Sequence, residues 1–240
     1  HHSSVKSPTM RAEETIKMKT FLFFTLSCRA SGLVANDPSP KRRVMETVSA
    51  LQRQPSVARR TAVLDAIRDL EAEGSTTGSL DGRWSLIFST QLPLEMESTA
   101  AGGSRGPLQF VTDSLYGAFF KVAPALAGAQ ADGGGEASNE QRLDLASRAL
   151  ANRVRIPLPG SGSWVELCVQ GEVTQAKTAA LLDVKFRAVN VKLRGGTAVT
   201  LPLPSPVGTL RTTHCDDDLR VSRGGRGGVF VLKRIRGAAF

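Results

Sequence analysis

Residues 207–234 read VGTLRTTHCDDDLRVSRGGRGGVFVLKR, and this stretch decides the fold class. Apolar and polar residues alternate through 210–214 and again through 219–221, which is the period of β-strands. The aspartates 216–218 and the glycines within 224–228 separate the runs. Both favour tight turns, because Asp side chains accept hydrogen bonds from nearby backbone N–H groups and Gly adopts positive φ without strain. The stretch therefore predicts a β-meander that closes a sheet.

The stretch also combines a threonine pair, an acidic turn, the pattern Leu-Arg-x-Ser-Arg-Gly, a glycine turn and Val-Phe-Val. This combination resembles the C-terminal signature of the plastid lipid-associated proteins, also called plastid fibrillins. The family usually has an aromatic residue and a leucine before the acidic pair, where this chain has His214, Cys215 and Asp216. The residues that match the signature are Thr212, Thr213, Asp217, Asp218, Leu219, Arg220, Ser222, Arg223, Gly224, Gly228, Phe230 and Val231.

A second motif opens an expected strand at residues 80–90. Trp84, Leu86 and Phe88 fall on one face of this strand by alternation, so they are expected to point together at a core or a cavity. The triplet from Gly82 to Trp84 is similar to the start of lipocalin-like barrels, in which the Trp closes one barrel end and a late Arg packs across it. The resemblance implies that Arg234 is that arginine here.

Two amphipathic helices are expected upstream of this strand. Ser39 is a suitable N-cap before Pro40, and apolar residues then recur with helical spacing up to Pro55. A second apolar stripe runs through residues 56–73 and ends at Gly74. In the resembled family a helical pair precedes the barrel, so these helices extend the resemblance upstream.

Further strands are expected in the second half of the chain. Residues 150–158, 164–174 and 181–193 carry strand patterns, and the last of these is expected to place Leu182, Val184, Phe186 and Ala188 on its apolar face. Six to nine short strands without intervening helices favour an antiparallel sheet. The expected fold is therefore mainly β: an antiparallel lipocalin-like β-barrel preceded by two short amphipathic α-helices.

Several segments between these strands carry other expectations. Residues 108–111 and 119–122 are apolar enough for short strands. Residues 123–140 are rich in Ala and Gly and are expected to form a mobile loop. The proline-rich residues 201–206 are expected to be a connection and not a central strand.

The composition is that of a globular protein, with 41% hydrophobic and 22% charged residues among 240. The net charge of +9 has two interpretations: an anionic partner such as nucleic acid or a membrane surface, or basic residues spread over solvated strand faces and a targeting segment. We favour the second and expect no nucleic-acid partner. Cys28, Cys168 and Cys215 have neither a metal-ligand spacing nor a disulfide pattern.

The first residues have the layout of a signal peptide. Met18 is flanked by lysines and followed by the apolar run 21–26 and by small residues up to Ala30. The run is too short to span a bilayer as a mature helix, and a buried N-terminal helix is the alternative. With the family resemblance, this layout implies import into a plastid and a mature chain that begins between Ser31 and Asn36. The expected parts are a removed targeting segment or transit peptide at 1–36, a helical pair at 37–78 and a barrel at 79–236, with the fibrillin-type domain at about 41–234.

No catalytic constellation is evident. His214 is the only histidine beyond the first two residues, and the neighbours 214–218 are expected to form a solvated turn, because adjacent side chains on a turn cannot all converge on one metal or nucleophile. The glycines of 224–228 lack the Lys-Ser/Thr of a phosphate loop. We expect no enzyme activity, no metal and no cofactor.

Three function classes remain. The resemblance implies a carrier whose barrel holds a carotenoid, a prenylquinone or a fatty acyl lipid, or a structural coat or accessory protein on thylakoid membranes, photosynthetic complexes or plastid lipid droplets (plastoglobules). An enzyme on a lipocalin-like barrel has no supporting residues. For the carrier, the expected lining is Trp84, Leu86, Phe88, Val184, Phe186, Phe230 and Leu232, although aromatic residues on the inner face of a small barrel are more often core filler than ligand contacts.

Peripheral membrane contact is also expected. The basic residues of the helices and of the C-terminal stretch would supply it through anionic head groups. The alternatives are helical stripes packed on the barrel and arginines that form a solvated strand edge. The residues concerned are Lys41, Arg42, Arg43, Arg53, Arg59 and Arg60 in the helices, and Arg220, Arg223 and Arg226 in the C-terminal stretch.

Overall fold

Two helices and nine strands make up the described part of the computed structural model, which comprises residues 38–90, 119, 126–128, 137–176, 178, 180–225 and 227–237. The helices are α1 (Pro40–Arg53) and α2 (Val57–Ala72). The strands are β1 (Gly82–Ser89), β2 (Ser138–Asp144), β3 (Ala149–Leu158), β4 (Ser163–Gln175), β5 (Leu181–Leu193), β6 (Val199–Pro202), β7 (Val207–Cys215), β8 (Leu219–Gly224) and β9 (Val229–Arg234). All of them belong to one structural unit, residues 38–240.

The helices begin where the sequence predicts. Ser39 Oγ accepts a hydrogen bond from the backbone N–H of Arg42 at 3.4 Å, and Ser56 Oγ accepts one from the backbone N–H of Arg59 at 3.2 Å. Each serine thereby satisfies one of the N–H groups that a helix start leaves without a partner. After α2, Gly74 adopts a φ of 65°, which glycine allows without strain. Both expected helices are confirmed.

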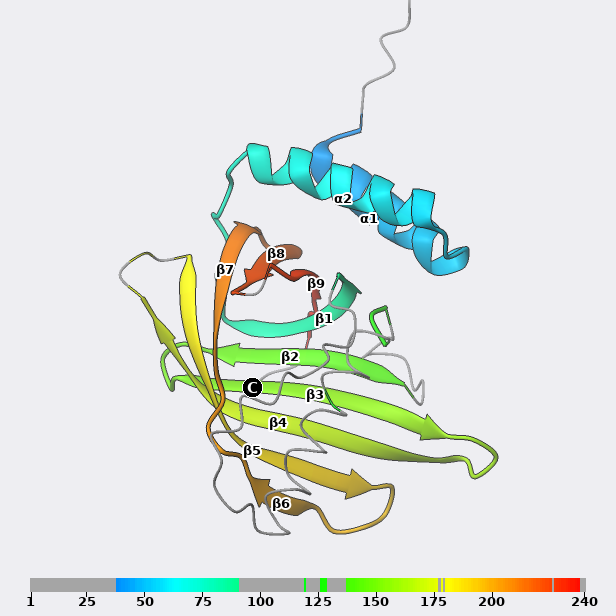
Figure 1. Ribbon diagram of the computed structural model, residues 1–240, viewed down its shortest axis with the longest axis vertical. Helices are drawn as coiled ribbons and strands as arrows, with labels where there is room; N and C mark the ends of the chain where they lie inside the picture. Colours follow the sequence, from blue (N-terminus) through cyan, green and yellow to red (C-terminus); the bar gives the residue numbers. More distant parts are fainter. Residues whose placement is uncertain are drawn as a thin grey trace, which may run out of the picture. The chain divides into compact units, whose positions relative to one another are not determined.

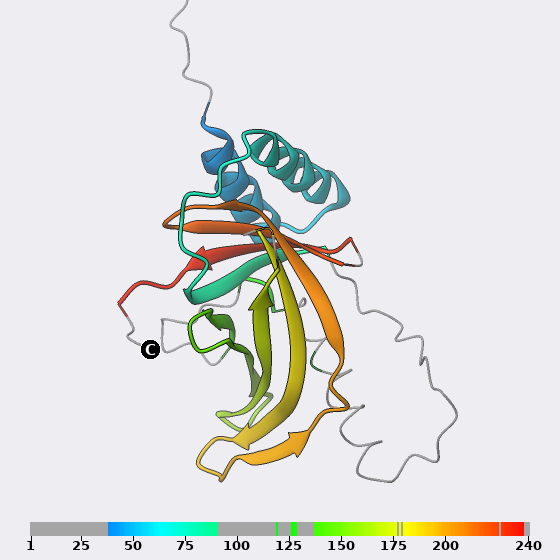
Figure 2. The ribbon, with the colours of Figure 1, turned by 90° about the vertical axis from the view of Figure 1, so that its left-hand side faces the viewer.

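The nine strands form one antiparallel sheet in the order β4-β3-β2-β1-β9-β8-β7-β5-β6. Because β4 also pairs with β5, the sheet closes into a ring, which we call the barrel (Figures 1 and 2). Residues 181–185 of β5 pair with β7, whereas residues 188–191 pair with the short edge strand β6. The expected architecture, mainly β and antiparallel behind two helices, is confirmed.

Three register shifts change which residues share a face of the sheet. Ile87 in β1, Thr213 in β7 and Arg187 in β5 are each extra relative to the partner strand. An extra residue moves the alternation by one position. Two expected assignments are wrong for this reason. Phe88 does not lie on the same face as Trp84 and Leu86. After Arg187 the buried apolar residue is Val189 and not Ala188.

Two segments that the sequence marks as irregular contain strands. β2 starts at Ser138, inside the expected loop 123–140, and it was not predicted as a strand. β6 ends at Pro202, inside the expected connection 201–206. β6 lies at an edge of the sheet, where proline removes no hydrogen bond that a second neighbour needs. The expected strand 108–111 lies outside the described residues.

The apolar residues separate into an outer and an inner set. Outside the barrel, α1 and α2 bury their stripes against β1, β8 and β9, in what we call the helix-facing cluster (Figure 1). Its members from the helices and strands are Val44, Val48, Val63, Ala66, Ile67, Leu70, Phe88, Leu219, Val221, Val229 and Val231. Within the described residues, neither helix is long and apolar enough to cross a membrane.

The inner set fills the barrel from one end to the other. Around Trp84 it comprises Leu80, Leu86, Leu143, Leu150, Val173, Leu182, Val184, Cys215 and Leu232, and toward β6 it comprises Phe119, Val154, Leu167, Val169, Val189 and Leu203. Phe186 packs against both groups. The barrel interior is therefore a continuous apolar core whose two ends are formed by different strands.

Candidate functional site

Trp84 occupies one end of the barrel interior and is fully buried. Its indole N–H donates to the Leu80 carbonyl at 3.0 Å, which satisfies the one polar atom of the side chain. The Arg234 guanidinium lies 4.0 Å from the ring centroid, and Arg234 is also the register partner of Trp84. The expected packing of Trp84 against Arg234 is confirmed.

Arg234 is held by backbone carbonyls in this position. Its two terminal nitrogens donate to the carbonyls of Asp81 at 2.7 Å and Ser79 at 2.5 Å. Gly82 has a φ of 131°, and a Cβ at this position would lie 2.7 Å from an Arg234 nitrogen. The Gly-x-Trp motif therefore has a steric reason here, since the glycine makes room for the arginine that covers the Trp.

Arg220 of β8 also contacts Trp84, with its guanidinium 4.8 Å from the ring centroid. The side chain is fully buried, and burial lowers the pKa of the guanidinium to about 10. Gln141 Oε1 accepts a hydrogen bond from it, while Nε has no partner. Other polar groups lie close by along the same inner face: Gln141 donates to Asn152 at 2.9 Å, and the hydroxyls of Thr212 and Ser222, the register partner of Phe230, are 3.3 Å apart.

The structure brings six of the seven expected lining residues together in the barrel. Trp84, Leu86, Val184 and Leu232 are buried there, and Phe186 and Phe230 are half-buried against them. Phe88 lies on the opposite face, in the helix-facing cluster, where the Arg60 guanidinium is 5.8 Å from its ring centroid. The chain's own Phe119 and Ala127 pack among the inner residues.

The apolar inner face continues beyond the barrel toward the hairpin ends of β3, β5 and β6. Leu158 and Leu193 follow the inner residues Ile156 and Val191 by two positions, and Val199 precedes the inner residue Leu201 by two. The three are 36%, 54% and 56% exposed. We call them the apolar lip. Sequence alternation could have indicated their face but not their exposure, which depends on where the sheet ends.

Most of the remaining signature residues join the helices to the barrel. Glu71 of α2 accepts hydrogen bonds from the Arg223 guanidinium at 2.8 and 2.5 Å and from the Thr213 hydroxyl at 2.7 Å. Burial would raise the pKa of the Glu71 carboxyl, but these donors outweigh it and lower the pKa. The sequence could not indicate this contact, because Glu71 and Arg223 lie far apart along the chain.

The acidic turn fastens α1 in the same manner. Asp216 accepts hydrogen bonds from the backbone N–H groups of Asp218 at 2.7 Å and Leu219 at 2.8 Å, and it pairs with Lys41 at 2.8 Å. Partial burial would raise the pKa of Asp216, but Lys41 and the two N–H groups lower it to about 2. Asp218 also pairs with Lys41, at 3.1 Å, whereas Asp217 is exposed on the turn.

Two further signature residues are explained by packing around the β8–β9 turn. The backbone N–H of Gly224 donates to the Gly228 carbonyl at 2.8 Å, and a Cβ on Gly224 would lie 3.3 Å from the Phe230 ring. Val231 points into the helix-facing cluster. Arg226, expected to be able to meet head groups, lies outside the described residues.

The His214 neighbourhood is a packed turn. The ring of His214 is buried, with Nε2 3.3 Å from Asp216 Oδ2. Cys215 is fully buried, and burial raises the pKa of its thiol, which keeps it protonated. Among the residues that the structure describes, no group of three or more His, Cys, Asp or Glu side chains is arranged to hold a metal ion.

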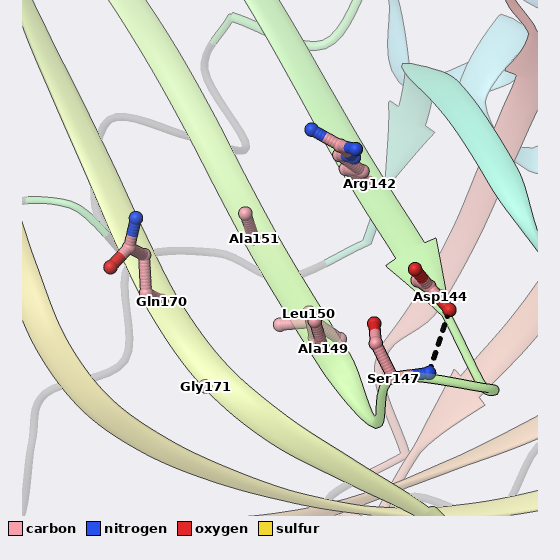
Figure 3. Close-up of a pocket in the computed structure, with 8 residues that line it drawn as sticks. All are labelled: Arg142, Asp144, Ser147, Ala149, Leu150, Ala151, Gln170 and Gly171. Atoms are coloured by element: carbon pink, nitrogen blue, oxygen red, sulfur yellow. Dashed lines mark hydrogen bonds between the residues drawn. The ribbon is translucent and has the colours of Figure 1, made fainter. Parts of the chain in front are cut away.

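A separate hollow lies on the outer face of β2, β3 and β4 (Figure 3). It forms over the small side chains of Ala149 and Ala151 and over Gly171, and it is bordered by Arg142 and by Asp144, which accepts a hydrogen bond from the Ser147 N–H at 2.9 Å. None of the expected site residues lines it. The hollow therefore belongs to the surface of the barrel and not to its interior.

Comparison with known proteins supplies a family. The PAP_fibrillin family model matches residues 115–233. The matched range begins before β2 and ends within β9, so it includes the acidic turn and the arginines of β8. No curated protein and no solved structure matches the chain.

Proposed function

Residues 115–233 belong to the PAP_fibrillin family of plastid lipid-associated proteins, and we propose that this chain binds or carries one apolar molecule inside its barrel. Membership of the family implies residence in a plastid and association with lipid, and the family is generally non-enzymatic. The proposed ligand is a carotenoid, a prenylquinone or a fatty acyl lipid. The proposed place of work is the thylakoid or the plastoglobule.

One observation carries the proposal: inward-facing aromatic residues are only half-buried. Phe186 and Phe230 point into the barrel, yet each keeps part of its surface exposed. Apolar surface that stays in contact with water gains about 25 cal/mol per Å² when a ligand covers it. The apolar lip continues this surface outward, so an apolar ligand could enter along it without crossing a polar rim.

Extraction of bound molecules tests the proposal. The purified protein is incubated with a plastid lipid and pigment extract, re-isolated, and its bound molecules are identified by chromatography and mass spectrometry. We expect about one apolar molecule per chain, and Phe186→Glu should abolish it because a carboxylate would then face the apolar interior. Val57→Glu is the matched control, since Val57 is 84% exposed at the start of α2.

A structural coat or membrane-bound accessory protein is the second candidate, and the apolar lip favours it. The helical stripes are not available for membrane contact, because they are buried in the helix-facing cluster. Several helical basic residues are also ion-paired: Lys41 with Asp216, Arg42 with Glu46 and Arg43 with Asp69. We therefore place the proposed peripheral contact at the lip, beside Lys192 and Arg194.

Vesicle flotation distinguishes the two surfaces. On vesicles that contain anionic plastid lipid, Leu193→Ser with Val199→Ser should weaken binding, whereas Val57→Ser should not. Raising the salt concentration should weaken the binding that remains, because screening reduces attraction between basic groups and the surface. If a chain without the helices still folds but no longer binds the vesicles, the membrane contact is made by α1 and α2.

The targeting segment is part of the same proposal. Residues 1–36 lie outside the described residues, and we keep them as a removable segment ahead of the helical pair at 37–78 and the barrel at 79–236. N-terminal sequencing of the protein isolated from plastids should begin between Ser31 and Asn36. Recovery of residues 21–26 in that protein would contradict the assignment.

A further inference from the structure

Arg220 is a buried cation without a counter-charge. Its side chain is 2% exposed, and among the described residues no carboxylate forms an ion pair with it. The groups that contact it are a neutral amide, Gln141, and the face of Trp84. A buried charge is costly unless it is paired and hydrogen-bonded, so this arrangement lacks the partner that would compensate it.

The other arginines of this region show what compensation looks like in the same protein. Arg223, three residues along β8, has both the Nε and a terminal nitrogen on Glu71. Arg83 places the same pair of nitrogens on Glu140, at 2.7 and 2.8 Å. Arg234 donates from both terminal nitrogens to backbone carbonyls, while its Nε has no acceptor. Arg220 has fewer acceptors than any of the three among the described residues: the Gln141 amide oxygen accepts from one terminal nitrogen, and the Nε is buried with no acceptor.

The Arg220 side chain faces the barrel interior, so a partner for its charge would bind there. Its register partners are Leu232, in the inner apolar set, and Cys215, and the inward-facing Ser222 follows two residues later. The side chain therefore emerges among residues proposed to hold the ligand. A polar group at one end of an otherwise apolar site fixes the orientation of a ligand with one polar end.

We infer that Arg220 is the head-group anchor of the barrel and that the ligand is an apolar carboxylate, such as a long-chain fatty acid. A carboxylate matches the planar guanidinium, accepts from its nitrogens and supplies the missing negative charge. The carboxylate would take the acceptor position that the Gln141 amide oxygen occupies, while Gln141 keeps its hydrogen bond to Asn152. The acyl chain then lies along Phe230 and Phe186 toward the apolar lip. This inference rests on the proposed function, because it names the ligand class for the same interior.

Paired ligands test the inference. In a Trp164→Phe background Trp84 is the chain's one remaining tryptophan, so its emission reports on binding beside Arg220. The affinity for oleic acid at pH 8 is compared with that for oleyl alcohol, which has the same chain and no charge. We expect the acid to bind about tenfold tighter or more, as a charge-assisted hydrogen bond implies. Arg220→Met should remove this preference while the alcohol keeps its affinity within about threefold.

Two further variants separate charge from packing. Arg220→Lys keeps the positive charge and should retain part of the preference for the acid, whereas Arg153→Met removes a charge from the outer face of β3 and should change neither affinity. Equal binding of acid and alcohol in the unmutated protein would overturn the inference and leave the apolar carrier standing. Binding of neither would instead overturn the proposed function.

A measurement without a variant at Arg220 covers the case in which Arg220→Met does not fold. Oleic acid labelled with ¹³C at the carboxyl group is bound to the unmutated protein and titrated by NMR. Beside Arg220 the carboxylate should stay ionised at least one pH unit below its ordinary pKa, because a neighbouring cation favours the charged form. A bound carboxyl group that titrates at or above its ordinary pKa would place the head group elsewhere and overturn the inference.

Discussion

Arginine residues on the two faces of β8 have opposite environments. On the outward face, Arg223 is paired with Glu71, and its apolar neighbours Leu219 and Val221 are sealed beneath the helices. On the inward face, Arg220 has no carboxylate partner, and nearby Phe230 is only half-buried. The outward face is therefore complete within the chain, whereas the inward face leaves charge and apolar surface for a ligand. Removing a group should cost stability outside and affinity inside.

Trp84 is the exception among the inward residues. Because it also closes one end of the barrel, its loss should reduce stability. Trp84→Ala removes a fully buried indole that the Arg220 and Arg234 guanidinium groups both contact, and we expect a loss of about 3–5 kcal/mol in the free energy of unfolding. Denaturant melts measure this loss. A change under about 1 kcal/mol would mean that the barrel end does not depend on this ring.

The helix-facing side should respond strongly to the loss of a single aliphatic side chain. Leu70 of α2 is fully buried against the barrel, and Leu70→Ala should cost about 2–5 kcal/mol. Ligand affinity per folded molecule should be unchanged, because Leu70 lies outside the barrel. A variant that folds normally but loses ligand would show that the helices shape the interior.

The Glu71–Arg223 contact should contribute less than the apolar packing around it. Glu71→Gln removes the charge from a carboxylate whose side chain is 14% exposed, and we expect a loss of about 1–3 kcal/mol. The double variant with Arg223→Met should lose less than the sum of the two single variants, since both break one contact. Additive losses in denaturant melts would mean that the two residues act separately.

The acidic turn gives the outward side a pH dependence. The folded pKa of Asp216 is lowered to about 2 from its ordinary value of 3.8, so its contribution to stability is fully present above the unfolded pKa and is lost as pH falls from about 4 toward 2. Lys41→Met should reduce the steepness of that loss, because Lys41 is one of the groups that hold the carboxylate ionised. Melts at pH 6, 4 and 3 measure it. If the pH dependence of stability is unchanged in the variant, the backbone N–H groups alone lower the pKa of Asp216.

Arg220→Met should have the smallest effect on stability, and this is where the two faces differ most. Replacing an uncompensated buried cation by an apolar side chain of similar length is expected to change the free energy of unfolding by less than about 1 kcal/mol, or to raise it. The same melts provide the value. A loss of several kcal/mol would mean that Arg220 is a structural residue like Arg234.

The sequence was most informative where a local rule decides the structure. Serine caps and helical spacing located both helices, and Asp and Gly marked the turns around β8. The register shifts at Ile87, Thr213 and Arg187 were not predictable, since ordinary side chains occupy these positions and the shift depends on the partner strand. This is why Phe88 was assigned to the wrong face.

The remaining errors have the same origin in long-range pairing. β2 reads SNEQRLD and shows no apolar alternation, yet strands pair with it on both sides and Asn139 and Glu140 are buried. Likewise, no local pattern distinguishes Arg220 from Arg223. The division between a paired and an unpaired arginine on one strand exists only after the helices have covered one face of the sheet.

Methyl NMR of the protein titrated with oleic acid and, separately, with oleyl alcohol tests the central claim most directly. Both ligands should shift the methyl signals of the inward residues Leu86, Val184 and Leu232, and should leave those of the helix-facing residues Val63, Val221 and Val231 in place. Shifts confined to the helix-facing methyl groups, or no shift at saturating ligand, would contradict the claim that the barrel interior is the binding site.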